Sequence, residues 1–287
     1  MGADGTDHGT ESAPPLLRLH LFGGFRVTRD GGRALAERWQ RPSARALVKL
    51  LAVSPGHSLH REQAMDICWP DADPSAALGS LRVALHAARR ALEPELAPRA
   101  TSSYLTADGT LLRLDPGTVW IDADHAERLA DNALASGFSA QLAAALDAFT
   151  GELLPEDRYA PWAEARREQL AVVSERLRIT LAEALLEEGA PEEAAAVARR
   201  ALDENPADER AHQILIGAYL RQGLRRQAVR QFHACREALD AELGVRPGSE
   251  TERLHLLALD SGSPAVQVAH RFGPRGDRRR GSRRGCP

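Results

Sequence analysis

The stretch from Arg41 to Leu114 most constrains the fold, because its pattern predicts three helices followed by a hairpin. The third predicted helix, residues 73–92, has two unlike faces. One face is an apolar stripe whose members recur at steps of three and four: Leu78, Leu81, Leu85, Ala88 and Leu92. The opposite face is small, polar and basic: Ser75, Gly79, Arg82, His86 and Arg90. A helix with these faces can enter the major groove of DNA.

Capping and turn residues set the limits of the elements around this helix. The first helix is expected over 42–53, with a proline at its first position, and the second over 61–69, with Leu59 as an apolar staple before it. Asp73 is expected to cap the third helix. Residues 104–106 and 111–114 read as two strands joined by a turn, which would form a wing. Within residues 17–27, Leu17, Leu19 and Leu21 alternate with Arg18, His20 and Phe22, so a small antiparallel sheet should precede the helices, with a hairpin turn at 30–32.

A second, helical domain is predicted after the turn at residues 115–117. Leu181, Leu185, Leu186, Gly189 and Ala194 are matched at an offset of 34 by Leu215, Tyr219, Leu220, Gly223 and Ala228. This offset is the tetratricopeptide period. The predicted fold is therefore mainly α: a winged helix-turn-helix with a small sheet and a wing over 16–115, and an all-α tetratricopeptide-like domain over 116–259. Residues 1–15 and the Arg-rich segment 260–287 are expected to be disordered.

Charge separates the two predicted domains. Residues 16–115 carry 14 basic and 10 acidic side chains, whereas residues 116–259 carry 16 basic and 25 acidic ones. The chain as a whole has a net charge of −3. A basic domain followed by an acidic one is the distribution expected if only the first meets phosphate.

Several classes of protein are excluded by what the sequence lacks. Its three cysteines are far apart, so we expect no disulfide framework and a location in the reducing cytoplasm. No cysteine–histidine cluster has zinc spacing, no apolar run is long enough to span a membrane, and the N-terminus has no signal-peptide pattern. No catalytic motif occurs either. We therefore expect no metal, no cofactor and no enzymatic activity.

The DNA-contacting candidates divide into two groups. Those on the third helix are Ser75, Gly79, Ser80, Arg82, His86, Arg89 and Arg90. Arg82 is the first choice for a base contact, since a guanidinium can bind guanine at two acceptors; the alternative is a solvated or phosphate-binding arginine. Arg89 and Arg90 either contact phosphate or pair with Glu93. Arg45, Lys49 and Arg113 are candidates for the DNA backbone, with solvent-facing surface roles as the alternative.

The same segments resemble a known family. ARALVKLLA (44–52), ICWPDADP (67–74) and SLRVALHAARRAL (80–92), after an initial strand and Trp39, are similar to the OmpR-type winged helix of the Streptomyces antibiotic regulatory proteins. GELLPE (151–156), PWAEARREQL (161–170), DENPADERAH (203–212), GAYLRQGLRRQAVRQF (217–232) and AELGVRPGSE (241–250) resemble the bacterial transcriptional activator domain that follows it in that family. The similarity covers about residues 16–259.

The resemblance implies a transcriptional activator at the nucleoid. Such proteins bind direct repeats in double-stranded DNA near a promoter, contact RNA polymerase holoenzyme and commonly control biosynthetic gene clusters, and self-association on DNA is open. The third helix matches the family pattern less well at four residues: Gly79, Ser80, Ala87 and Ala88. This departure motivates the alternative function, a protein-interaction adaptor on tetratricopeptide-like helices that does not read DNA.

Overall fold

The computed structural model describes residues 16–29, 33–35 and 39–260. The chain forms two compact units, which are described separately. The first unit contains residues up to 135 together with 144–174, and the second contains 136–143 together with the residues from 175 onward. The expected disordered segments and the hairpin turn at 30–32 lie outside the described residues, apart from Asp260.

The first unit begins with a four-stranded sheet in the order β3-β2-β1-β7. The strands are β1 (Leu17–His20), β2 (Arg26–Arg29), β3 (Arg33–Ala34) and β7 (Val119–Ile121). β1 pairs with β2 antiparallel, as expected from the alternation, and with β7 parallel. β7 was not predicted, because the sequence beyond residue 117 was taken as helical. Three residues are too short a run for periodicity to identify as a strand.

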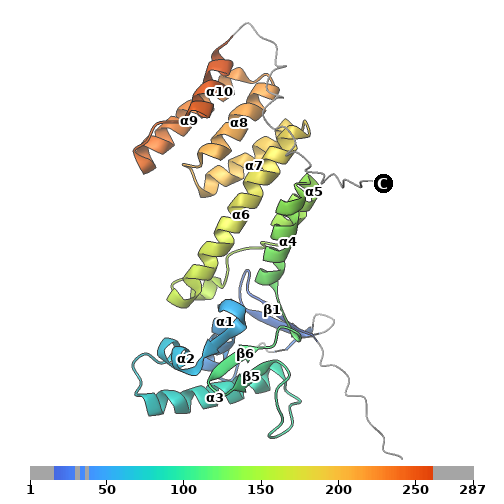
Figure 1. The fold of residues 1–287 in the computed structure, drawn as a ribbon, viewed down its shortest axis with the longest axis vertical. Coiled ribbons are helices and arrows are strands. Elements are labelled where there is room, and N and C mark those ends of the chain that lie inside the picture. Colours follow the sequence, from blue (N-terminus) through green and yellow to red (C-terminus); the bar gives the residue numbers. More distant parts are fainter. Residues whose placement is uncertain (1–15, 30–32, 36–38, 261–287) are drawn as a thin grey trace, which may run out of the picture. The chain divides into compact units, whose positions relative to one another are not determined.

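Three helices and a second sheet form the winged helix (Figure 1). The helices are α1 (Pro42–Val53), α2 (Arg61–Cys68) and α3 (Pro74–Leu92), and a 3-10 turn, η2 (Pro55–His57), follows α1. β4 (Ser58–His60), β6 (Leu111–Leu114) and β5 (Leu105–Asp108) make the sheet, in that order. The three helices and the hairpin match the expectation. Leu59, the expected staple residue before α2, lies in β4 and pairs with Leu112.

The first unit continues past the expected domain boundary. It takes in most of α4 (Asp122–Ser136), the end of α5 (Ser139–Asp147), η3 (Pro155–Asp157) and the first half of α6 (Pro161–Glu187). The Asp122 carboxylate accepts hydrogen bonds from the backbone N–H groups of Leu21 at 2.9 Å and Phe22 at 3.2 Å. The core that begins in β1 also includes Ile121, Ala126 and Leu154. The turn at 115–117 therefore lies within this compact unit, not at its edge.

The second unit is entirely helical in the described residues. It comprises the rest of α5 and α6, then α7 (Pro191–Glu204), α8 (Glu209–Arg221), α9 (Arg225–Leu243) and α10 (Ser249–Leu259). Successive helices pack against each other from α7 to α10 (Figure 1). The mainly α fold with small sheets in its N-terminal part confirms the predicted fold class.

The repeat of 34 residues corresponds to two equivalent helix hairpins. Gly189 and Gly223 both have positive φ, 83° and 74°, a conformation that glycine adopts without strain. The N–H that follows each glycine donates to the carbonyl five residues earlier: Ala190 to Leu185 at 2.9 Å and Leu224 to Tyr219 at 2.8 Å. Ala194 and Ala228 are fully buried in the next helix of each pair. These shared details confirm that the sequence repeat is a structural one.

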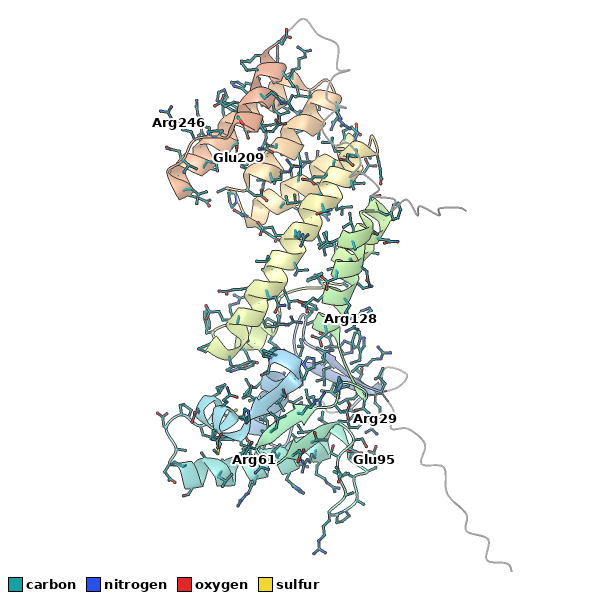
Figure 2. All side chains as sticks on the ribbon, viewed as in Figure 1. Arg29, Arg61, Glu95, Arg128, Glu209 and Arg246 are labelled. Atoms are coloured by element: carbon teal, nitrogen blue, oxygen red, sulfur yellow. The ribbon has the colours of Figure 1, made fainter. Side chains whose placement is uncertain are left out.

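The segment AELGVRPGSE fixes α10 beside α8. One carboxylate oxygen of Glu209, a residue labelled in Figure 2, accepts from the backbone N–H of Gly248 at 2.6 Å and from the Thr251 hydroxyl at 2.5 Å. Gln213 donates to the Thr251 hydroxyl at 3.0 Å. A Cβ at position 248 would lie 3.3 Å from Glu209, so glycine permits this approach. The motif therefore holds the last helix in place.

Candidate nucleic-acid interface

The start of α3 is fixed by its own sequence. Asp73 Oδ1 accepts from the backbone N–H groups of Ser75 at 3.0 Å and Ala76 at 3.1 Å, and from the Ser75 hydroxyl at 2.7 Å. The hydrogen bond from the Ser75 side chain, with those from the backbone, lowers the pKa of Asp73 below its usual range. Pro74 occupies the first turn, where it needs no hydrogen-bond donor. The predicted cap is confirmed.

The two faces of α3 separate as their side chains predicted. The buried positions face the core of the first unit, and α3 packs against α1 and α2: Ala77, Leu81, Ala84, Leu85, Ala88 and Leu92. Leu78, expected in the stripe, is only half-buried at its rim. The exposed positions include all five of the expected polar face: Ser75, Gly79, Arg82, His86 and Arg90. Val83 is also on the outside, at 45 % exposure, and Ser80 is half-buried.

Two arginines at the end of α3 are held by backbone carbonyls. Arg89 Nε donates to the Leu105 carbonyl of β5 at 3.0 Å, and Arg90 Nη1 donates to the Leu96 carbonyl at 2.7 Å. Glu93 instead accepts from the backbone N–H and the hydroxyl of Ser103, both at 3.1 Å. The expectation that either arginine pairs with Glu93 is therefore wrong. Neither Arg89 nor Arg90 forms an ion pair with a carboxylate among the described residues.

Arg61 belongs to the same basic region, although it was not among the residues predicted from the sequence. It is the first residue of α2, and its backbone N–H donates to the Thr110 carbonyl in the wing at 2.8 Å. Its Nε is buried without a hydrogen-bond partner in the described structure. Burial lowers the pKa of Arg89, and the neighbouring Arg61 lowers it further. A cation in the first turn of a helix opposes the helix dipole, and this signal was available in the sequence.

The wing presents Arg113 on its outer side. Leu112 and Leu114 on either side of it in β6 are buried, so the alternation of the strand leaves Arg113 exposed. Gly109, with φ of 54°, makes the turn between β5 and β6. The wing and the end of α3 are joined by the bond from Arg89 to Leu105. The exposed face of α3, Arg61 and Arg113 together form what we call the basic surface of the winged helix.

Arg45 and Lys49 are placed differently from the expectation. Lys49 is only 4 % exposed, and its Nζ lies 3.0 Å from Glu156 and 2.5 Å from Asp157. Arg45 Nη2 lies 3.0 Å from the same Glu156 oxygen. They line a pocket of about 530 Å³ that also includes Phe25 and Trp39. The charge of Lys49 is used inside the unit, so it is not available to a DNA phosphate, whereas Arg45, with a side chain 38 % exposed, stays a proposed contact to the DNA backbone.

No metal-binding arrangement competes with this surface in the described residues. No group of three histidine, cysteine or acidic side chains is placed to hold a metal ion there. Burial raises the pKa of the Cys68 thiol to about 11 and that of Cys235 to about 12, so neither is a thiolate at neutral pH. None of the helices described is long and apolar enough to cross a membrane.

Comparison with known proteins identifies the helical part of the chain. Residues 121–257 match the family model of the bacterial transcriptional activator domain. The match begins at Ile121, the last residue of β7, and ends in α10.

Two curated Streptomyces coelicolor proteins are similar over nearly the whole chain. Regulatory protein AfsR is 28 % identical over 90 % of this chain, and Transcriptional regulator RedD is 27 % identical over 93 % of it. The match covers 26 % of AfsR and 77 % of RedD, so the chain spans about a quarter of the longer relative. The resemblance to the Streptomyces antibiotic regulatory proteins is thus supported by distant similarity to two Streptomyces proteins, one named as a regulatory protein and the other as a transcriptional regulator.

A solved structure has the same fold. Mycobacterium tuberculosis EmbR, in complex with a low-affinity phosphopeptide, superposes with a TM-score of 0.72 at 23 % identity. The match covers 86 % of this chain and 65 % of that chain. It supports the fold described above.

Proposed function

We propose that the chain is a sequence-specific DNA-binding transcriptional activator that reads the major groove with the outer face of α3. The observation that carries the proposal is the division of α3. Its apolar face is buried against α1 and α2, while its small and basic face is exposed along the whole helix. This is the geometry in which a recognition helix presents side chains to base edges.

The residues of the basic surface have distinct proposed roles. Arg82, exposed at the middle of α3, contacts a base, and His86 is placed one turn further along. Ser75, Gly79 and Ser80 are small, so the start of the helix can come close to the DNA. The phosphate contacts are the remaining arginines of this surface: Arg61, Arg89, Arg90 and Arg113.

The finer functional proposals rest on the relatives. One curated relative is named as a regulatory protein and the other as a transcriptional regulator, and the match to the second covers 77 % of its length. We extend this to binding of direct repeats near a promoter, recruitment of RNA polymerase and control of a biosynthetic gene cluster.

The test is fluorescence anisotropy with promoter fragments from the protein's own gene neighbourhood and with random DNA, across a salt series. Wild type should prefer one fragment. Arg82→Ala should lose about 1–3 kcal/mol of that preference, the value of one bidentate base contact. Arg61→Ala should weaken binding to all fragments alike and reduce the salt slope by about one.

The matched control is Arg200→Ala, an exposed arginine of α7 in the acidic second unit. It should leave affinity and salt slope unchanged. Equal, weak binding of wild type to every fragment would refute sequence-specific reading. In that case the protein-interaction adaptor becomes the better description.

A further inference from the structure

Val83 is an apolar side chain close to the centre of the exposed face of α3. It is 45 % exposed and is not one of the DNA contacts proposed above. Successive residues of an α-helix are turned by about 100°, so Val83 lies within about 30° of the direction opposite to the buried stripe. By the same rotation, Arg82 lies about 70° from that direction. Val83 is therefore nearer than Arg82 to the middle of the face that would meet DNA.

The surroundings of Val83 on the helix surface are open. A helical residue is surrounded by those three and four positions away, which for Val83 are Gly79, Ser80, His86 and Ala87. Three of these four neighbours are small, and a Cβ at Gly79 would have nothing within 4 Å. The same three are among the four positions at which the helix matches the family pattern less well. The departures from that pattern therefore clear the space around one branched apolar side chain.

The stability of α3 does not account for a valine at this position. Valine is a weaker helix former than alanine, and an exposed position gains little from burial in return. The branched side chain has one strongly preferred rotamer in a helix, so its two methyl groups are held in place before any partner binds. α3 also contains no acidic residue that would repel phosphate. Its outer face can thus bring two fixed methyl groups close to DNA.

We propose that the γ-methyl groups of Val83 pack against the C5-methyl group of a thymine in the major groove. This inference rests on the proposed function and names a base that the outer face of α3 selects. Thymine is the base that presents a methyl group in the major groove, so an apolar side chain there discriminates it from the other three. The small residues around Val83 then change which base is read, whereas the adaptor alternative takes them as a loss of reading.

The test removes one methyl group from the DNA and the apolar side chain from the protein. The full-length protein is titrated by fluorescence anisotropy with its preferred promoter fragment, in which each thymine is replaced in turn by deoxyuridine. Deoxyuridine lacks the C5-methyl group and keeps the O4 acceptor of thymine. At one thymine of each bound repeat, the replacement should raise the Kd of wild type about three- to fivefold, the value of one buried methyl group.

Val83→Ala should raise the Kd for the unmodified fragment by at least the same factor. It should show no further rise with deoxyuridine at the thymine to which wild type is sensitive, because the two changes remove the same contact. Alanine is the stronger helix former, so α3 stays folded in this variant. The matched control is Val172→Ala, the same change at a 63 % exposed valine of α6 in the same unit. Its Kd should equal that of wild type for every fragment.

Three results would overturn the inference. The first is a wild type that is insensitive to deoxyuridine at every thymine. The second is equal sensitivity of wild type and Val83→Ala at every thymine, and the third is an unchanged affinity of Val83→Ala for the unmodified fragment. Failure of the proposed function appears differently, as absence of any fragment preference in wild type, and it would overturn the inference as well.

Discussion

Replacing Lys49 with methionine tests whether this residue stabilises the fold or contacts DNA, as its position in the sequence suggested. Lys49→Met keeps an unbranched apolar stem but removes the charge that pairs with Glu156 and Asp157. Glu156 keeps its bonds to Arg45 and to the Phe25 N–H, whereas the Asp157 carboxylate has no other hydrogen-bond partner among the described residues. The substitution therefore leaves the Asp157 carboxylate without a positive charge or a hydrogen-bond donor beside it.

The magnitude follows from the burial of the three side chains. The Lys49 side chain is 5 % exposed, but Glu156 and Asp157 are 29 % and 28 % exposed. Breaking a fully buried pair costs about 3–5 kcal/mol, and an exposed pair is worth about 0.2–1 kcal/mol. The Nζ also lies 5.7 Å from the centre of the Phe25 ring, a cation–π contact worth about 0.5–1 kcal/mol. We expect the free energy of unfolding of the first unit to fall by about 2–3 kcal/mol.

The assay uses the position of the tryptophans. The chain has four, Trp39, Trp69, Trp120 and Trp162, and all lie in the first unit. Denaturant unfolding followed by tryptophan fluorescence therefore reports on that unit, and its midpoint should fall with no change in slope. In an Asp157→Asn background, where the stranded charge is already absent, Lys49→Met should cost about 1 kcal/mol. Arg45→Met, at an exposed pair, should cost less than about 1 kcal/mol.

One result would refute this reasoning. If Lys49→Met unfolded within about 0.5 kcal/mol of wild type and instead reduced the salt slope of DNA binding by about one, Lys49 would be a phosphate contact. The ion pair would then not form in solution.

Three further predictions concern single residues. The hydrogen bond to Asp124 raises the pKa of His57. The His57–Asp124 pair therefore stabilises the folded state fully below pH 6.5, and this contribution is lost as the pH rises through the higher pKa of the folded state. The difference in free energy of unfolding between wild type and His57→Gln, followed by tryptophan fluorescence, should shrink over that range. An added Cβ at Gly79 has nothing within 4 Å, so Gly79→Ala should stabilise the first unit by about 0.5–1 kcal/mol. The same methyl group should weaken promoter binding if DNA lies close to α3 at this position. Unchanged DNA affinity would rule out a close approach of DNA to Gly79. Thr251→Val removes the fully buried hydroxyl that donates to Glu209 and accepts from Gln213. The free energy of unfolding, obtained from thermal unfolding followed by far-UV circular dichroism, should fall by about 1–3 kcal/mol. No change would mean that water replaces these hydrogen bonds.

Much of the fold is local in origin and was therefore predictable. The limits of α1 follow from a proline at its start, and those of α3 from the Asp73 cap. The repeat of 34 residues was visible because Gly189 and Gly223 serve the same turn. The exposed positions of α3 were predicted correctly, since a regular helix with one apolar stripe exposes the opposite side.

The candidate site was predictable only in part. Arg82 and His86 follow from the periodicity of one helix. Arg61 was missed, because its nearness to Arg89 depends on the pairing of β4 with the wing. Arg89 and Arg90 were assigned Glu93 as an alternative partner from spacing alone, but Glu93 is taken by Ser103. Local spacing allows such a pair, and competition from a distant segment decides it.

The sequence by itself determined the helices, their caps, the repeat and the outer face of α3, because each depends on residues within one or two turns. Only the tertiary structure decided the fate of Lys49 and the extent of the first unit. Lys49 is buried because η3, more than a hundred residues later, covers the side of α1 that an isolated helix would expose to water. The first unit extends past residue 117 because β7 pairs with β1. In addition, the Asp122 carboxylate accepts hydrogen bonds from the backbone N–H groups of Leu21 and Phe22, which follow β1. Contacts between segments so far apart leave no periodic trace in either segment, so they become evident only when the chain has folded.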